Sequence, residues 1–139
     1  MSKVINIERA MLRISPYVHY TPVLTNSSLN NLTESSLFFK CENFQRSGSF
    51  KIRGATNAIL QLSKSELDKG VITVSSGNHG AALSMALSLM GGTAKVIMPK
   101  NTPKVKVDNV IRNGGKIIWC EPNYKSREEI LNSIMEVTV

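Results

Sequence analysis

The pattern of hydrophobic and polar residues changes near residue 70, and the part before it mixes several short elements. Apolar residues at Val4, Ile7, Met11 and Ile14 have helical spacing, which predicts a helix over residues 4–14. The pattern then predicts an extended piece at 21–24, a helical turn at 27–32, a strand at 37–42 and a helix at 51–62.

From Gly70 onward, short apolar runs alternate with segments of helical periodicity. The expected strands cover residues 71–74, 94–98 and 116–120, and the expected helices cover 80–90, 105–113 and 126–135. Such alternation predicts a parallel sheet with crossover helices, and glycine pairs at 91–92 and 114–115 end two of the helices. The polar run 64–70 marks the expected boundary between domains at 1–63 and 64–139.

Composition indicates a globular chain with a hydrophobic core. Apolar residues make up 42% of the 139 residues, yet no run approaches the ~20 residues that a membrane-spanning helix needs. Glu8 stands where a secretory signal would be apolar, so we expect a cytoplasmic protein with no membrane partner. Cys41 and Cys120 lack metal-ligand spacing, so we predict buried, reduced thiols and no metal site in this chain.

The net charge of +7 is compatible with a nucleic-acid surface, an anionic small ligand or a piece of a larger protein. The one dense basic group, at residues 95–106, contains no aromatic residues on which bases could stack. We therefore expect no nucleic-acid partner.

Lys51 is the first candidate for chemistry. It stands at the start of the expected helix 51–62, after Phe50 and the small residues Ser47, Gly48 and Ser49. Small residues let the backbone approach a ligand, and the partial positive charge of a helix start favours the neutral amine that reacts with aldehydes. A solvated surface lysine explains the same pattern, so this residue alone does not decide.

The second candidate is the loop Ser75-Ser76-Gly77-Asn78-His79-Gly80, between an expected strand and an expected helix. Such a turn at the carboxyl end of a parallel strand presents backbone N–H groups and hydroxyls to an anion, here a carboxylate. The alternative is an ordinary turn in which Ser75 or Ser76 only caps the helix.

Read together, the two motifs resemble the serine racemase and serine/threonine dehydratase family of pyridoxal-phosphate enzymes of fold type II. Glu42 followed by residues 47–55, Ser-Gly-Ser-Phe-Lys-Ile-Arg-Gly-Ala, is similar to the family's cofactor-attachment signature, and residues 75–80 are similar to its substrate-carboxylate loop. Residues 19–24, 37–42 and 120–122 extend the likeness over almost the whole chain. The resemblance implies a tryptophan-synthase-β-like α/β fold, with the N-terminal segment in a large domain and a parallel βαβ small domain.

The resemblance also implies roles for individual residues. Lys51 would bind pyridoxal 5'-phosphate as a Schiff base and act as a base, Phe50 would pack beside the cofactor ring, and Asn78 would contact the cofactor. The residues implied to hold the substrate carboxylate are Ser75, Ser76, Gly77, Asn78 and His79. Ser76 would also exchange a proton on the opposite face of the substrate, which racemisation needs and dehydration does not.

The resemblance further places two peripheral sites. Arg127 falls where the family has an arginine that meets the carboxylate of an acidic ligand, although a solvated arginine beside Glu128 and Glu129 explains it equally. The family's site for an ATP activator would map onto Asn26, Ser27, Ser28, Arg46, Ser47 and Asn113. Arg46 and Asn113 stand where a lysine and a tyrosine are expected.

The family's tetraglycine loop for the cofactor phosphate and its Mg²⁺ carboxylates have no counterpart in this sequence. We therefore expect a fragment of a homodimeric enzyme that interconverts L- and D-serine and eliminates water from serine or threonine, giving a 2-oxo acid and ammonia. A non-catalytic truncated product and a threonine dehydratase without racemase activity are the alternatives.

Overall fold

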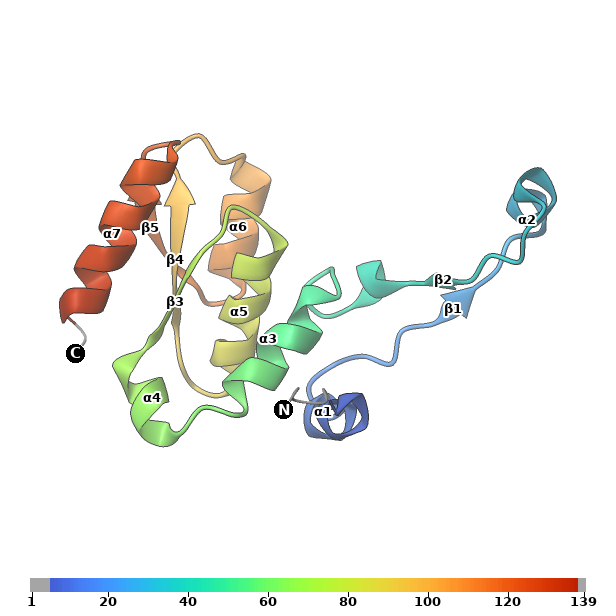
Figure 1. Ribbon diagram of the computed structural model, residues 1–139, viewed down its shortest axis with the longest axis horizontal. Helices are drawn as coiled ribbons and strands as arrows, with labels where there is room; N and C mark the ends of the chain where they lie inside the picture. Colours follow the sequence, from blue (N-terminus) through green and yellow to red (C-terminus); the bar gives the residue numbers. More distant parts are fainter. Residues whose placement is uncertain (1–5, 138–139) are drawn as a thin grey trace, which may run out of the picture.

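The computed structural model describes residues 6–137, and its second half is a parallel sheet between helices (Figure 1). The strands β3 (Val71–Val74), β4 (Ala94–Pro99) and β5 (Lys116–Cys120) lie in the order β3-β4-β5. Val71 pairs with Ala94, and Lys95 pairs with Lys116. The sheet and its parallel register are as the alternating pattern predicted.

Helices cover both faces of this sheet. Helices α5 (Asn78–Leu89) and α6 (Lys104–Arg112) lie on one face, and α7 (Tyr124–Val137) lies on the other (Figure 1). The carboxyl ends of the strands meet at one edge, at the top of Figure 1, and all three helices start there. This edge is where parallel α/β structures bind ligands.

The main core lies between the α5 face of the sheet and α3 (Lys51–Ile59). Its fully or almost fully buried members are Ile52, Ala55, Ile59, Ala81, Ala82, Leu83, Ala86, Leu87, Ala94, Val96, Met98 and Val110. The alanines of α5 let α3 approach closely, and full burial of a side chain such as Ile52 contributes roughly 2–3 kcal/mol. The core therefore contains residues from both sides of the polar run 64–70.

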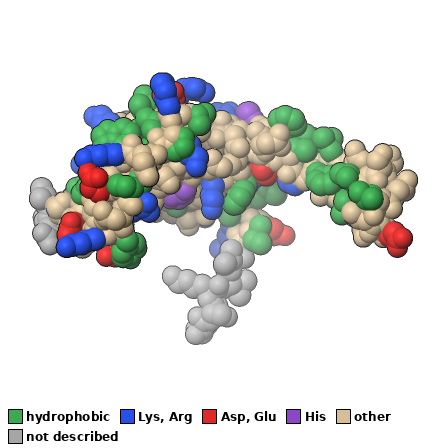
Figure 2. Space-filling model, turned by 90° about the horizontal axis from the view of Figure 1, so that it is seen from above, with side chains coloured by type: hydrophobic (Ala, Val, Ile, Leu, Met, Phe, Trp, Pro, Cys, Tyr) green, Lys and Arg blue, Asp and Glu red, His purple; other side chains and the backbone are tan. Residues whose placement is uncertain are grey.

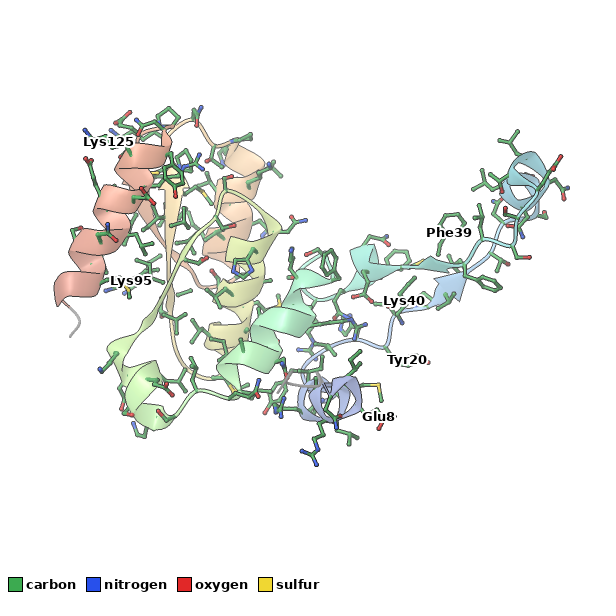
Figure 3. The ribbon with its side chains drawn as sticks, viewed as in Figure 1. Glu8, Tyr20, Phe39, Lys40, Lys95 and Lys125 are labelled. Carbon is green, nitrogen blue, oxygen red and sulfur yellow. The ribbon has the colours of Figure 1, made fainter. Side chains whose placement is uncertain are left out.

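The first part of the chain contains α1 (Ile7–Ile14) and a segment that extends away from the body (Figure 1). In this segment, which we call the arm (residues 22–40), β1 (Val23–Leu24) pairs antiparallel with β2 (Phe39–Lys40), and α2 (Ser27–Thr33) lies at the tip. At its base, Lys40 Nζ lies 4.8 Å from the centroid of the Tyr20 ring (Figure 3).

The arm exposes much of its apolar surface, whereas Lys and Arg side chains are prominent on the body (Figure 2). Its large apolar residues that are at least two-fifths exposed are Val23, Leu24, Leu29, Leu32, Phe38 and Phe39. Apolar surface of this extent is typical of an interface. No helix within residues 6–137 is long and apolar enough to cross a bilayer.

Most predicted elements are confirmed within about three residues, with two differences of length. The strand expected at 37–42 is reduced to β2, because Glu42 begins the short 3₁₀ helix η1 (Glu42–Phe44). The helix expected at 51–62 ends at Ile59 in a turn. Helix α1 confirms the N-terminal helix from Ile7 onward, while Val4 lies outside the described residues.

The stretch expected to be only a polar boundary contains a helix, α4 (Lys64–Lys69). The Ser63 side chain accepts a hydrogen bond from Glu66 N, and the Glu66 carboxylate accepts one from Ser63 N. This reciprocal capping box satisfies two backbone donors at the helix start, and the Ser-x-x-Glu pattern was the signal for it. Gly70, at φ 89°, ends the helix.

Candidate functional site

Lys51 is the first residue of α3, and its amine is open to solvent. Its Nζ lies 4.9 Å from the centroid of the Phe50 ring, which is itself 59% exposed. The preceding turn is tight, because Gly48 N donates to Gln45 O at 2.7 Å and Gly48 has φ 76°. Within the described part of the chain, no carboxylate pairs with Lys51, so the amine is available to a ligand.

The loop at residues 75–80 joins β3 to α5 at the carboxyl edge of the sheet. Ser75 Oγ accepts hydrogen bonds from Gly77 N at 3.3 Å and from Gly80 N at 3.0 Å. Ser75 is half-buried, whereas Ser76, Asn78 and His79 are exposed. The Ser75 hydroxyl thus accepts hydrogen bonds from two backbone N–H groups at the start of α5. The exposed residues Ser76, Asn78 and His79 remain free to meet an anion.

Gly80 explains why α5 can start so close to the sheet. A Cβ at this position would lie 2.9 Å from Val96 Cγ1 and 3.4 Å from Ser75 Cβ. The absent side chain therefore lets the first turn of α5 pack directly on β4. Gly80 was part of the motif, but its packing role is visible only in three dimensions.

The packing of α3 against α5 brings the two candidate regions to one end of the molecule. The two helices run in the same general direction, so their starts lie at the same end of the pair (Figure 1). Lys51 and Phe50 are at the start of α3, and residues 75–78 lead into the start of α5. An exposed amine, a flat ring and a set of free N–H and hydroxyl groups therefore share one region.

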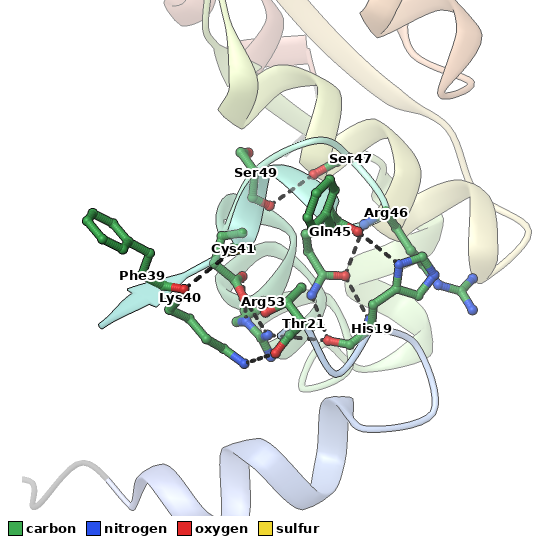
Figure 4. Close-up of polar contacts among 12 residues, drawn as sticks. His19, Thr21, Phe39, Lys40, Cys41, Gln45, Arg46, Ser47, Ser49 and Arg53 are labelled. Atoms are coloured by element: carbon green, nitrogen blue, oxygen red, sulfur yellow. Dashed lines mark hydrogen bonds and ion pairs between the residues drawn. The ribbon is translucent and has the colours of Figure 1, made fainter. Parts of the chain in front are cut away.

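Polar contacts tie the segment before Lys51 to the rest of the chain (Figure 4). Arg53 donates to both oxygens of Glu42, from Nε at 2.8 Å and from Nη2 at 2.7 Å. The buried hydroxyl of Thr21 donates to Glu42 Oε1 at 2.5 Å, and Lys40 Nζ donates to the carbonyl of Thr21 at 2.6 Å. Arg53 holds the pKa of Glu42 down to about 2, with the Thr21 hydrogen bond adding to the effect.

The Gln45 side chain fixes the same segment from the other side. It accepts from His19 N at 2.8 Å, donates to His19 O at 2.8 Å, and accepts from Arg46 N at 3.0 Å. Gln45 is only 3% exposed. Three hydrogen bonds thus hold the buried Gln45 amide to backbone groups of His19 and Arg46, which favours one backbone arrangement.

The remaining predicted residues lie elsewhere. Arg127 is in the first turns of α7, across the sheet from α5, and its Nε is buried without a partner in the described structure. Asn26 caps α2 at the tip of the arm, while Asn113 follows α6 in the body (Figure 1). The six residues of the expected nucleotide site are thus not brought together within one chain.

The residues present fit part of pyridoxal phosphate. Lys51 offers an accessible amine for the aldehyde, the Phe50 ring offers a flat apolar surface, and Asn78 offers an exposed amide. Ser49, next to this site, has a buried hydroxyl without a hydrogen-bond partner. The sequence has glycine pairs but no longer glycine run, so it does not itself contain the expected cradle for the phosphate.

The exposed amine of Lys51 and the loop at residues 75–80 lie at one end of a parallel α/β structure, the region where such structures bind ligands. The sequence matches the family described as "Pyridoxal-phosphate dependent enzyme" over residues 14–138, and the chain belongs to this family. The cofactor of this family is pyridoxal phosphate.

Known relatives confirm the family and the fold type expected from the motifs. Serine racemase from Arabidopsis thaliana is 53% identical over 135 residues, 97% of this chain and 41% of the relative. The beta-hydroxyaspartate dehydratase of Paracoccus denitrificans is 49% identical over 91% of this chain and 40% of its own. The structure of maize serine racemase matches with a TM-score of 0.91 and 47% identity, over 95% of this chain and 40% of that one. The chain spans about two-fifths of the length of these relatives.

Proposed function

We propose that this chain provides the cofactor lysine and the substrate-carboxylate loop of a pyridoxal-phosphate enzyme that interconverts L- and D-serine. The same site would eliminate water from serine or threonine, which yields a 2-oxo acid and ammonia. The observation that carries the proposal is the start of α3 with Lys51 beside the start of α5 with the Ser75–Gly80 loop. Similarity to serine racemases supports it.

In this proposal, the residues of this chain bind the substrate carboxylate and move the α-proton. When bound, the cofactor supplies an electron sink that stabilises negative charge at the substrate α-carbon. The N–H groups at the start of α5, with its partial positive charge, would hold the carboxylate. Lys51 Nζ would take or return the α-proton on one face, and Ser76 Oγ would do so on the other.

Ser76 separates racemisation from simple elimination. A single base returns the proton to the face from which it came, so a racemase needs a second group, and Ser76 is exposed on the loop. Ser76→Ala should abolish D-serine formation from L-serine in an assembled enzyme while it spares pyruvate formation. Equal loss of both products would refute the assignment of Ser76 as the second base.

Ser75 takes a different role in this proposal from the one implied by the motif. Its hydroxyl already accepts two backbone hydrogen bonds, so it would shape the loop and could offer the carboxylate only its own proton. The carboxylate would therefore rest mainly on N–H groups of the exposed residues Ser76, Asn78 and His79.

The attachment of the cofactor gives the direct test. The chain is incubated with pyridoxal phosphate and reduced with borohydride, which makes the attachment permanent, and peptide mapping then locates the modified lysines. We expect Lys51 to be modified several-fold more than Lys106, an exposed lysine on α6. Equal modification of the two would refute the assignment and leave the non-catalytic alternative.

Further parts of the proposal concern the whole enzyme. Residues 1–63 would belong to a large domain and residues 64–139 to a small domain. The exposed apolar arm would form part of a homodimer, for which sedimentation of the assembled enzyme is the test. Activation by ATP or Mg²⁺ and a cytoplasmic location stay predictions, to be tested by titration and by cell fractionation.

A further inference from the structure

The loop that carries Lys51 has few hydrogen bonds of its own. Between Gln45 and Lys51 the structure has the turn bond from Gly48 N to Gln45 O, the bond from Arg46 N to the Gln45 side chain, and a 3.4 Å contact from Ser47 Oγ to Ser49 O. The Ser49 hydroxyl has no partner at all in the described structure. The position of the loop must therefore be determined largely at its two ends.

Glu42 and Arg53 stand at these two ends. Glu42 begins η1, nine residues before Lys51, and Arg53 lies in the first turn of α3, two residues after it. The two parallel hydrogen bonds between the side chains fix orientation as well as distance, because a planar guanidinium matches a carboxylate in one geometry. The pair therefore closes the loop across residues 43–52.

The closed loop is also anchored to one further segment, residues 19–21. Thr21 Oγ1 donates to Glu42, Arg53 Nη2 donates to His19 O at 3.3 Å, and Gln45 bonds both backbone groups of His19 (Figure 4). Glu42 is 16% and Arg53 31% exposed at the side chain, so solvent screens the pair only partly. Arg53, in the first turn of α3, is thus held by two groups, the Glu42 carboxylate and the His19 carbonyl.

We infer that the Glu42–Arg53 ion pair is a positioning device that holds the Lys51 amine where the cofactor aldehyde meets it. The inference rests on the proposed function of Lys51. Neither residue touches the cofactor in this role; both act through the backbone of the loop and of α3. A pair that only stabilised the fold would leave the reactivity of Lys51 unchanged in the folded chain.

The test compares modification of Lys51 by pyridoxal phosphate and borohydride with modification of Lys106 in the same sample. In Glu42→Gln we expect the Lys51-to-Lys106 ratio to fall at least threefold, whereas Glu42→Asp, which keeps the charge, should retain at least half of the original ratio. The control is Glu121→Gln, which removes the exposed ion pair with Lys100 and should leave the ratio unchanged. Circular dichroism and Trp119 fluorescence establish that each variant is folded.

The possible results distinguish the positioning role of the ion pair from the proposed function of Lys51. An unchanged ratio in folded Glu42→Gln, or a Glu42→Asp variant as low as Glu42→Gln, would overturn the positioning role while Lys51 keeps its proposed function. Equal modification of Lys51 and Lys106 in the unaltered chain would refute the proposed function itself, and the positioning role with it. If Glu42→Gln does not fold, Arg53→Gln gives the same test. It also removes the ion pair, but the new glutamine amide can still donate one hydrogen bond to Glu42.

Discussion

The Glu42–Arg53 pair should make the stability of the chain depend on pH in a defined window. The pKa of Glu42 falls from its ordinary value of 4.5 to about 2 in the folded chain, chiefly because Arg53 hydrogen-bonds the carboxylate. Between these values the unfolded chain binds more protons than the folded chain, so stability increases with pH. The contribution is complete above about pH 5 and is lost as the pH falls through 4.5 toward 2.

The size of the effect follows from the two pKa values. A tenfold change in proton affinity corresponds to about 1.4 kcal/mol, so the lowered pKa of Glu42 represents on the order of 3 kcal/mol at neutral pH. Because the Arg53 side chain is 31% exposed and solvent screens the pair, this value is an upper bound. At pH 3 about 2 kcal/mol of it should be gone.

Glu42→Gln isolates this contribution, because it removes one titrating group and leaves the others. Urea unfolding, followed by circular dichroism at pH 7, 5, 4 and 3, gives the free energy of unfolding of both chains. We expect the unaltered chain to exceed the variant by about 2–3 kcal/mol at pH 7 and by about 1 kcal/mol or less at pH 3. The Lys100–Glu121 pair is more than half exposed, so Glu121→Gln should leave the free energy of unfolding nearly unchanged at any pH. A Glu42→Gln deficit that stayed constant from pH 7 to pH 3 would refute the reasoning.

Two further predictions concern the free energy of unfolding in urea. Thr56→Val should stabilise the chain by about 1 kcal/mol, because the Thr56 hydroxyl is buried without a partner; destabilisation would indicate a hydrogen bond that the structure lacks. Gly115→Ala should cost about 1–3 kcal/mol, because its Cβ would lie 2.7 Å from Val110 Cγ1 and closer still to Ser84 Oγ. Gly54→Ala is the matched control, since nothing lies within 4 Å of a Cβ there, and it should stabilise α3 by about 0.5–1 kcal/mol.

The sequence predicted those helices and strands that a local pattern of apolar and polar residues marks. Strand β5 has the predicted bounds Lys116–Cys120, because its apolar run is confined between Gly115 and the polar residues after Cys120. Helix α4 was missed because a charged six-residue segment has no apolar period, although Ser63 and Glu66 carried a capping signal. Periodicity reports burial along one face and is silent about short helices held by their caps.

Only those parts of the candidate site that lie in continuous sequence motifs could be predicted. Lys51 and the Ser75–Gly80 loop are each continuous in sequence, so a resemblance found them. The partners that fix them are not continuous: Glu42 bonds Thr21 and Arg53, which lie 21 and 11 residues away. Such pairs depend on tertiary packing, which one sequence does not reveal.

The distance between the two halves of the site depends on residues that have no chemistry of their own. Lys51 is carried by α3 and Ser76 precedes α5, so the packing of these helices determines how the amine faces the loop. The contact is made by small side chains, among them Ala55, Ala81 and Ala82, each at most 5% exposed. Because interiors are close-packed, a larger side chain there would move one helix against the other and displace the amine from the loop without touching either. Any chemistry at this candidate site would therefore depend on the small residues of the core as much as on Lys51 and the loop.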